Sequence, residues 1–516
     1  MKKVLVCIIV IVMLFTSCDK AEEQKFDGVQ IKLSDDKIMV DGDVITNDNT
    51  QAVYSANDIV FYLAGKDFTY GEGAKEDEHQ QSEADDHTVV HITKPGKYLL
   101  SGQLSAGQIA VDLGEEAKTD PDAVVTIILN GVDITCTVAP AIIFYNVYEC
   151  GVADEETATK DVDTSKAGAN VIVADGTENN INGSYVAKIY ESYELNEAGT
   201  EVVDSKKLHK YDAAFYSKQS MNINGEKEYN GILNIKAENE GLDSELHLTI
   251  NGGVINIVSG NDGINTNEDN VSVTTINGGT LNIICDGSTG EGDGIDSNGW
   301  LVINGGTVIA QECATSGDAG IDSDKGIYIN AGKVVASGNM FDKIAGGEQT
   351  YIVLNFASRQ VGDSVYSLKN ADGKVVGEYN PTNDFTYLVV AGDELAEGDY
   401  TFWQGDTQLA ATSVNGMNMG EKPEMPQGEE NQQGNPPEPP EGFENMKRPQ
   451  ENGDLVMPDG ERPEKPEGEI PEGAGDMTPP NKFGGGEFTG TGETSATFTI
   501  VKGGNQFFNI SPVTIG

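Results

Sequence analysis

The sequence is poor in basic residues and in histidine. Lysine and arginine total 33 against 84 aspartates and glutamates, so the formal net charge is -51. This excess of negative charge argues against nucleic acid or an anionic lipid surface as a partner. The 5 histidines supply few imidazole ligands for zinc or copper. The acidic side chains therefore serve either solubility or the binding of hard cations.

Long apolar runs are also rare. The clearest one follows two N-terminal lysines and ends at Phe15, and it is too short for a membrane-spanning helix, which needs about 20 residues. The Thr-Ser-Cys that follows looks like a bacterial lipobox, whose cysteine becomes the acylated N-terminus. We expect residues 1–17 to be a lipoprotein signal peptide and Cys18 to be the lipidation site. The expected location is the outer membrane or cell surface, with the N-terminal lipid in the membrane.

Cysteine is scarce in the rest of the chain. After Cys18 only Cys136, Cys150, Cys285 and Cys313 remain. An even number in an exported protein permits disulfides, and the local pairings join the first to the second and the third to the fourth. Four buried free thiols are an equal alternative, so the spacing leaves the disulfide state open.

A repeat of 26 to 27 residues occupies the middle of the chain. Apolar and polar residues alternate on both sides of a corner that contains asparagine and glycine, which is the period of a strand, and helical patterning is absent. The corner asparagines lie 27, 26, 27 and 26 residues apart: Asn224, Asn251, Asn277, Asn304 and Asn330. We therefore predict an all-β protein, a right-handed parallel β-helix (solenoid) with an N-terminal cap and a small C-terminal β-domain. The asparagines should stack as a ladder.

A second corner in each repeat carries acidic side chains, and its clearest copy reads Asp-Gly-Ile-Asp-Ser at residues 293–297. Period two sends the isoleucine inward and the flanking residues outward, where carboxylates about 4.8 Å apart repel unless a cation neutralises them. Ca²⁺ favours such oxygen ligands, although Asp and Asn are also good turn residues. The predicted Ca²⁺ ligands, here called the acidic ridge, are Asp243, Asp262, Asn265, Asp293, Asp296, Asp318, Asp322 and Asp324.

The two corners, with the upstream Leu-Asn-Gly-Val-Asp-Ile at residues 129–134, resemble the calcium-binding β-helix carbohydrate-binding proteins of cellulolytic clostridia and gut bacteria. The resemblance covers residues 85–345 and departs from the pattern at Ala319 and in the insertion at 184–209. It implies a pectate-lyase-like solenoid, bound calcium, and a polysaccharide partner of the acidic plant type (pectin-like) or cellulose.

We expect residues 51–345 to form the β-helix carbohydrate-binding domain, after a tether and cap start at residues 18–50. Strand-like alternation returns at residues 346–420 and 483–516, which should form the C-terminal β-domain. Between them, residues 421–482 hold 13 of the 18 prolines and many glutamates, and we predict a disordered loop there.

Three functions compete at this stage. The first is a non-catalytic, monomeric, cell-surface lipoprotein that binds polysaccharide through Ca²⁺ on the acidic ridge. The second is a Ca²⁺-dependent polysaccharide lyase, which needs a base near the metal and for which Lys218 is the candidate. The third is a structural or adhesive surface protein in which Ca²⁺ serves stability alone.

Overall fold

The protein is built almost entirely of β-strands in the computed structural model, and the predicted all-β class is confirmed. Within the described residues, helix is confined to α1 (Gln81–Asp85) and to the 3-10 turn η2 (Glu115–Thr119), and no helix there is long and apolar enough to cross a membrane. The structure describes residues 26–61, 79–151, 153–186, 189–196, 199, 202–209, 211–414 and 494–513.

Strands one repeat apart pair side by side in parallel and form three ladders. The first ladder contains the strands that lead into the asparagine corner. Its members, in pairing order, are β1 (Val29–Leu33), β6 (Gly96–Leu104), β8 (Val125–Thr135), β10 (Ala169–Val173), β15 (Met221–Gly225), β18 (His247–Ile250), β21 (Val273–Ile276), β23 (Trp300–Ile303), β25 (Gly326–Ile329) and β27 (Ile344–Gly346).

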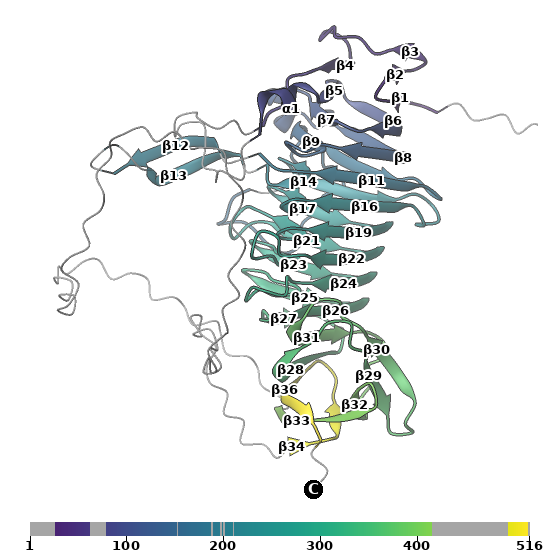
Figure 1. The fold of residues 1–516 in the computed structure, drawn as a ribbon, viewed down its shortest axis with the longest axis vertical. Helices are drawn as coiled ribbons and strands as arrows, with labels where there is room; N and C mark the ends of the chain where they lie inside the picture. Colours follow the sequence, from purple (N-terminus) through teal and green to yellow (C-terminus); the bar gives the residue numbers. More distant parts are fainter. Residues whose placement is uncertain are drawn as a thin grey trace, which may run out of the picture. The chain divides into compact units, whose positions relative to one another are not determined.

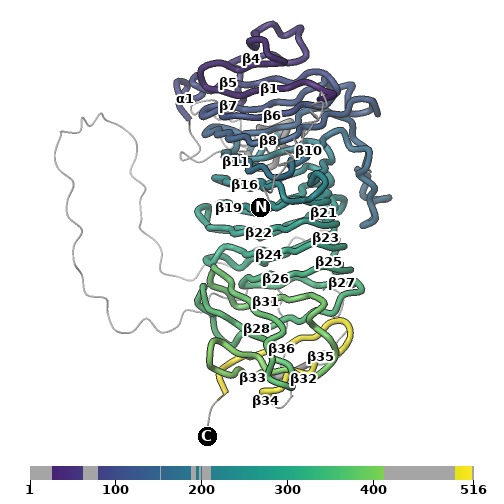
Figure 2. Tube along the Cα trace, turned by 90° about the vertical axis from the view of Figure 1, so that its right-hand side faces the viewer, coloured from purple at the N-terminus to yellow at the C-terminus, as the bar shows by residue number. Residues whose placement is uncertain are grey.

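The second ladder contains the strands that leave this corner, and it begins with the C-terminal ends of β6 and β8, where Gly102, Gln103 and Leu104 pair with Val132, Asp133 and Ile134. It continues through β11 (Glu178–Gly183), β16 (Ile232–Ala237), β19 (Val254–Ser259), β22 (Thr280–Cys285), β24 (Thr307–Gln311) and β26 (Lys333–Gly338). Figure 1 shows these strands one above another in chain order, and the view turned by 90° in Figure 2 shows the same stacking.

The third ladder carries the acidic corner. It runs through β4 (Val53–Ala56), β5 (Thr88–Ile92), β7 (Gly107–Asp112), β9 (Ile142–Asn146), β14 (Ala213–Ser217), β17 (Glu240–Ser244) and β20 (Ile264–Thr266). All of its pairings are parallel except that between β4 and β5. A parallel bridge from Ile264 to Ile295 extends it by one more repeat.

Alternation along each strand builds the core. In β22 the residues alternate between half-buried and fully buried, with Leu281 and Ile283 inside and Asn282 outside. Pairing in register places Ile257 on Ile283 and Asn256 on Asn282, so apolar side chains stack on apolar ones along the interior. One continuous hydrophobic cluster results, and it extends from Ile31 to Ala391.

Beyond the ladders the pairing becomes mainly antiparallel. β26 pairs with β31 in the antiparallel sense, and aromatic residues such as Phe356, Tyr366 and Phe402 lie in a second hydrophobic cluster. This region comprises β28 (Tyr351–Gln360), β29 (Tyr366–Asn370), β30 (Val375–Tyr379), β31 (Phe385–Ala391), β32 (Gly398–Gln404), β33 (Thr407–Val414), β34 (Thr494–Ser495), β35 (Phe498–Ile500) and β36 (Gly504–Pro512).

Two small antiparallel elements complete the described fold. β2 (Met39–Val40) and β3 (Asp43–Val44) extend from β1. Within the insertion at 184–209, β12 (Ile189–Leu195) and β13 (Val202–His209) form a separate two-stranded sheet. Residues 26–414 and 494–513 all fall within one compact unit, and the predicted domain boundaries stay predictions.

Several sequence-based predictions lie outside the described residues: the signal peptide at 1–17, Cys18, and the proline-rich loop at 421–482. The four remaining cysteines are free thiols. Burial raises the pKa of the Cys136 thiol to about 12 and that of Cys150 to about 11. Both therefore stay in the thiol form at neutral pH, in which cysteine is a poor nucleophile.

Candidate functional site

The acidic ridge stacks on successive strands of the third ladder. Asp243 of β17 pairs with Asn265 of β20. The backbone N–H groups of Asp296 and Asp322 then donate to the carbonyl oxygens of Ile264 and Ile295 at 2.8 and 2.7 Å. These four predicted ligands therefore occupy equivalent places in four successive repeats.

The expectation that this column faces solvent is wrong at its first two members. Asp243 is 0% exposed and Asn265 is 7% exposed. Period two does turn them away from the core, but that face is covered: Tyr216 pairs with Asp243 from the preceding strand, and Asn267 donates to Asp243 Oδ1 at 2.7 Å. Asp296 and Asp322 are half-buried and Asp324 is exposed, so the ridge opens toward its later repeats.

A second set of ridge residues ties neighbouring turns together. Asp262 Oδ1 accepts a hydrogen bond from the backbone N–H of Asp293 at 2.7 Å, and Asp293 Oδ1 accepts one from Ala319 at 2.6 Å. Asp318 Oδ2 likewise accepts from the N–H of Gly292 at 2.9 Å. Each carboxylate thus satisfies a backbone donor of an adjacent repeat, a structural role that the sequence analysis did not foresee.

These carboxylates destabilise one another's charged forms. Burial, followed by the negative charges of Glu240 and Asp296, raises the pKa of Asp262 well above its ordinary value. Burial and the charge of Asp262 do the same for the pKa of Asp293. Glu240 was not among the predicted ligands, although it precedes glycine in its repeat just as Asp262 and Asp293 do. The cluster has the electrostatic character of a cation site.

The chemistry of the ridge fits a hard cation only in part. Asn265 donates through Nδ2 to Glu240 at 3.1 Å, and among the described residues its buried Oδ1 has no hydrogen-bond partner. A buried amide oxygen in this state beside carboxylates is a ligand type that Ca²⁺ accepts. Within the same residues, however, no group of three or more His, Cys, Asp or Glu side chains is arranged to hold a metal ion. Ca²⁺ binding by the ridge stays a prediction.

Lys218 follows β14 directly, and its side chain is half-buried. Its backbone N–H donates to the carbonyl oxygen of Phe144 at 2.9 Å, and the N–H of Glu245 donates to Ser217 at 2.9 Å. Lys218 and Glu245 are therefore equivalent residues of adjacent repeats, as their columns predict. The catalytic role of Lys218 stays a prediction.

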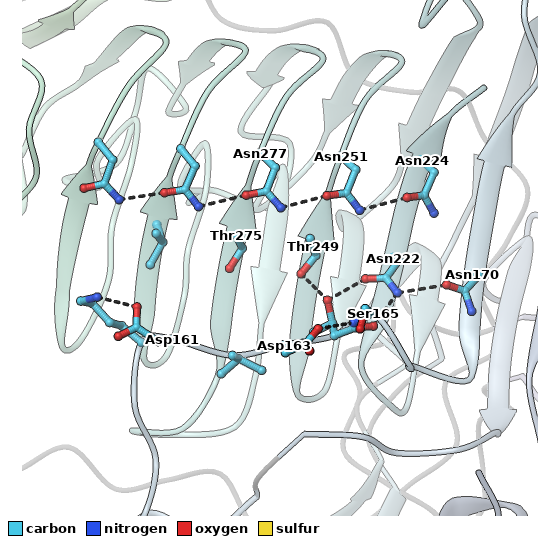
Figure 3. Close-up of a pocket in the computed structure, with 16 residues that line it drawn as sticks. Asp161, Asp163, Ser165, Asn170, Asn222, Asn224, Thr249, Asn251, Thr275 and Asn277 are labelled. Carbon is cyan, nitrogen blue, oxygen red and sulfur yellow. Dashed lines mark hydrogen bonds and ion pairs between the residues drawn. The ribbon is translucent and has the colours of Figure 1, made fainter. Parts of the chain in front are cut away.

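On the outer face of the first ladder, the five predicted corner asparagines form one chain of side-chain hydrogen bonds (Figure 3). From Asn251 onward, each Nδ2 donates to the Oδ1 of the asparagine one repeat earlier, at 2.7 to 2.9 Å, and the Nδ2 of Asn224 donates to the carbonyl oxygen of Val171 at 3.2 Å. Every ladder amide still keeps a second N–H and a second lone pair for other partners. Asn277 and Asn304, in the middle of the ladder, are exposed.

A groove of about 650 Å³ runs along this asparagine ladder, and we call it the ladder groove. Period two puts the residue two positions before each asparagine on the same face, so Asn222, Thr249 and Thr275 form a second row beside the ladder. The full lining consists of Lys160, Asp161, Val162, Asp163, Thr164, Ser165, Asn170, Asn222, Asn224, Thr249, Asn251, Thr275, Asn277, Val302, Asn304 and Asn330.

The segment 160–165, between β9 and β10, forms the opposite wall of the ladder groove (Figure 3). Thr164 Oγ1 lies 2.7 Å from Asn222 Oδ1 and 2.6 Å from Thr249 Oγ1, and Asn222 donates back to the carbonyl oxygen of Thr164 at 2.8 Å. At the other end, Lys160 pairs with Asp161 at 2.6 Å and lies over the ring of Tyr328. The wall is therefore attached to the ladder at both ends.

The groove lining is polar but nearly uncharged. Its ionisable members are Lys160, Asp161 and Asp163, and the first two form an ion pair. Amide and hydroxyl groups supply most of the remaining surface, in rows that repeat at the strand spacing of about 4.8 Å. Such a surface can donate to and accept from an extended ligand that carries hydroxyl groups at regular intervals.

The comparisons with known proteins are consistent with this surface. Residues 86–350, just over half of the chain, match the family described as "Carbohydrate-binding domain-containing protein". A curated protein of that description from Acetivibrio thermocellus is 29% identical over 169 residues, which cover 33% of this chain and 44% of that protein. The chain thus spans less than half the length of this relative.

Among solved structures, a polysaccharide lyase-like protein from C. thermocellum, determined as a gadolinium derivative, matches 59% of this chain and 93% of its own. It is 21% identical, with a TM-score of 0.32.

Removal of one ridge charge should stabilise the fold. The raised pKa of Asp262 means that its contribution to stability is present below its ordinary pKa and is lost as the pH rises through the folded-state value. Asp262→Asn keeps the oxygen that accepts from Asp293 but removes the charge. In a chelator, its gain in the free energy of unfolding over the wild type should increase as the pH rises above the ordinary aspartate pKa of about 4.

Urea denaturation at each pH measures this gain. Asp324→Asn, at an exposed position, is the matched control and should change stability by less than about 0.5 kcal/mol. A pH-independent difference between Asp262→Asn and the wild type would show that the carboxylates of the ridge do not repel one another.

Proposed function

We propose, on the premise that the chain belongs to the carbohydrate-binding domain-containing family, that it binds polysaccharide in the ladder groove and does not alter it. The observation that carries the proposal is the groove of about 650 Å³ along five hydrogen-bonded asparagines. Sugars are recognised through hydroxyl groups, each of which donates and accepts. An amide with one free N–H and one free lone pair matches that pattern.

The dimensions of the groove suit an extended polymer. Four strand spacings give the asparagine ladder a length of about 19 Å, enough for several sugar residues in a row. One strand spacing is close to the advance per residue of an extended β-1,4-linked hexose chain. Successive amides can therefore meet equivalent hydroxyls of successive sugars.

The charge of the groove bears on the kind of polysaccharide. A neutral polymer such as cellulose meets no electrostatic penalty against the almost uncharged lining. An acidic, pectin-like polymer is repelled by a chain of net charge -51 unless cations lie between them. We therefore rank a neutral polysaccharide first, and the pectin-like ligand depends on Ca²⁺.

For the architecture, we propose that the three ladders are the faces of a right-handed parallel β-helix. A tether and the start of an N-terminal cap at residues 18–50 precede it, and a C-terminal β-domain at 346–420 and 483–516 follows it. Parallel pairing in register at every repeat supports this proposal. The hydrogen-bonded stacking of asparagines from one repeat to the next supports the same architecture. A β-helix of this kind displays one residue of every repeat in a straight row, as polymer binding requires.

Loss of one groove amide should weaken binding. Asn277→Ala removes one donor and one acceptor from the middle of the ladder, and we expect affinity to fall roughly fivefold, since one hydrogen bond contributes about 1 kcal/mol. Electrophoresis through gels that contain hydroxyethylcellulose, xylan or polygalacturonate measures affinity as retardation. Equal retardation of Asn277→Ala and the wild type in every gel would count against the ladder groove.

The second ladder offers a matched control for this variant. Asn256 donates to Asn234 and accepts from Asn282, each at 2.8 Å. Asn256→Ala therefore removes the same number of side-chain hydrogen bonds as Asn277→Ala, but outside the groove. It should lose as much stability as Asn277→Ala and retain full binding.

The lyase alternative has its own test. Polygalacturonate is incubated with the protein and Ca²⁺ while the absorbance of unsaturated product is followed. A rise in absorbance that is lost in Lys218→Ala would support the lyase and overturn the non-catalytic proposal.

We further propose that the acidic ridge binds Ca²⁺, with Asp243, Asn265, Asp296 and Asp322 as its central ligands. The buried, unpaired Oδ1 of Asn265 and the raised pKa values of Asp262 and Asp293 support this proposal. Ca²⁺ would neutralise the mutual repulsion of the carboxylates. It would not have to contact the sugar.

Isothermal titration calorimetry with Ca²⁺ tests the ridge. Asp296→Ala should lose the binding heat of at least one site, because its carboxylate lies between Asn265 and Asp322 in the column. Asp372→Ala, an exposed aspartate outside the ladders, serves as the control. Identical titrations of the two variants would remove Asp296 from the ligand set.

The cell-surface anchor is a separate proposal. Its basis is the N-terminal sequence alone, in which a short apolar run is followed by Cys18. Expression in a bacterium fed labelled palmitate should label the protein, and Cys18→Ser should abolish the label. Labelling of the Cys18→Ser variant would contradict acylation at this residue.

A further inference from the structure

Tyr229 is an exposed aromatic residue near the first asparagines of the ladder, although it is not itself among the residues that line the ladder groove. It lies in the loop between β15 and β16, and it is 55% exposed. Its ring lies against Gly225 and Gly252, where a Cβ atom would overlap the ring. These glycines directly follow Asn224 and Asn251, which line the groove. The ring therefore lies beside the first two members of the asparagine ladder.

The loop that carries Tyr229 is fastened to the preceding repeat by Asp175. Its Oδ2 accepts hydrogen bonds from the backbone N–H groups of Lys227 at 2.9 Å and Glu228 at 2.8 Å. In return, Asn230 Oδ1 accepts from the N–H of Gly176 at 2.7 Å. The backbone N–H of Glu228 and then that of Lys227 lower the pKa of Asp175 by donating to its carboxylate, so its charge is present at neutral pH. The ring is thus held in place before any ligand arrives.

The backbone at Tyr229 is strained. Its φ is +54°, in the left-handed region that side chains other than those of glycine, asparagine and aspartate rarely adopt. An asparagine such as Asn230, or a glycine, would adopt that conformation at position 229 with less strain. Such strain persists where the surrounding structure enforces it, and it concentrates at sites of function. A glycine at position 229 would adopt this backbone conformation with less strain. The benefit of a tyrosine there therefore comes from its ring.

We propose that the Tyr229 ring is a stacking platform for one pyranose ring of the polysaccharide held in the ladder groove. This inference rests on the proposed function. The C–H groups of a pyranose form an apolar face, while its hydroxyls project around the rim. A tyrosine ring offers that face a flat, rigid surface, and because the loop is already ordered little entropy is lost on contact. The ladder amides meanwhile bind the hydroxyls of the adjoining sugars.

The platform would also set the position of the bound polymer. Asparagine rows that repeat at every strand admit a polymer at several registers, each shifted by one sugar. A single aromatic ring at one end of the ladder favours the register in which a sugar covers it. Ligand sites commonly combine an apolar platform with a few polar groups in this way.

The test compares Tyr229→Gly and Tyr229→Phe in the full chain. Hydroxyethylcellulose, xylan and polygalacturonate are first compared with the wild type. Both variants are then run in affinity gels that contain the polysaccharide by which the wild type is retarded most. Tyr229→Gly relieves the positive φ, so a loss of binding cannot be attributed to a damaged fold, and thermal unfolding verifies this. We expect a loss of affinity of roughly tenfold for Tyr229→Gly and less than about twofold for Tyr229→Phe, which keeps the ring.

Glu228→Ala is the matched control, because Glu228 is exposed on the same loop and contributes its backbone, not its side chain, to Asp175. Wild-type affinity in Tyr229→Gly, with a loss in Asn277→Ala, would overturn the platform and leave the groove intact. Equal losses in Tyr229→Gly and Tyr229→Phe would also overturn it, since the ring would not be the determinant. A wild type retarded by no polysaccharide would overturn the proposed function and the platform together.

Discussion

Parallel pairing of strands in exact register is the constraint on which the rest of this structure depends. Because each strand pairs with the same strand of the next repeat, a residue lies beside its counterpart one repeat away, and any chemistry in the repeat becomes a row. The separation is 26 or 27 positions between β18, β21 and β23 but 22 between β16 and β19. The same rule produces the apolar interior, the asparagine ladder and the acidic ridge.

The outcome of stacking like on like differs with the side chain. Amides benefit, because each carries a donor and an acceptor and can bond to an identical neighbour, as Asn251 does with both Asn224 and Asn277. Stacked carboxylates destabilise one another, because a charged carboxylate can only accept hydrogen bonds and repels its neighbour. Burial and this repulsion raise the pKa values of Asp262 and Asp293. Their bonds to the backbone N–H groups of Asp293 and Ala319 offset part of that cost.

Much of this arrangement could be predicted from periodicity. The all-β class follows from the period of two, and the five corner asparagines follow from their constant spacing. A second row of hydrogen-bonded asparagines, from Asn234 through Asn256 to Asn282, was missed because its spacings of 22 and 26 residues are unequal. The shared Asn-Ile pair in each repeat is the signal that could have revealed it. The missed row at Thr249 and Thr275 is likewise implied by alternation.

The rest depends on segments that do not repeat. Periodicity fixes which way Asp243 points but not that Tyr216 and Asn267 cover it, so its burial was not foreseen. The wall formed by residues 160–165 is unique in the chain, and its attachment through Thr164 has no periodic signal. Tyr229 lies in a similar single loop, whose geometry depends on Asp175, a residue 54 positions earlier.

The asparagine ladder has a direction. In all four of its amide–amide bonds the Nδ2 donates toward the N-terminal repeats and the Oδ1 accepts from the C-terminal side, so the amide dipoles add along the groove and polarise one another. A sugar polymer also has two unlike ends. The groove therefore presents a different order of donors and acceptors to a polymer laid along it in one sense than to the same polymer reversed, so the proposed ligand would be held in one preferred orientation.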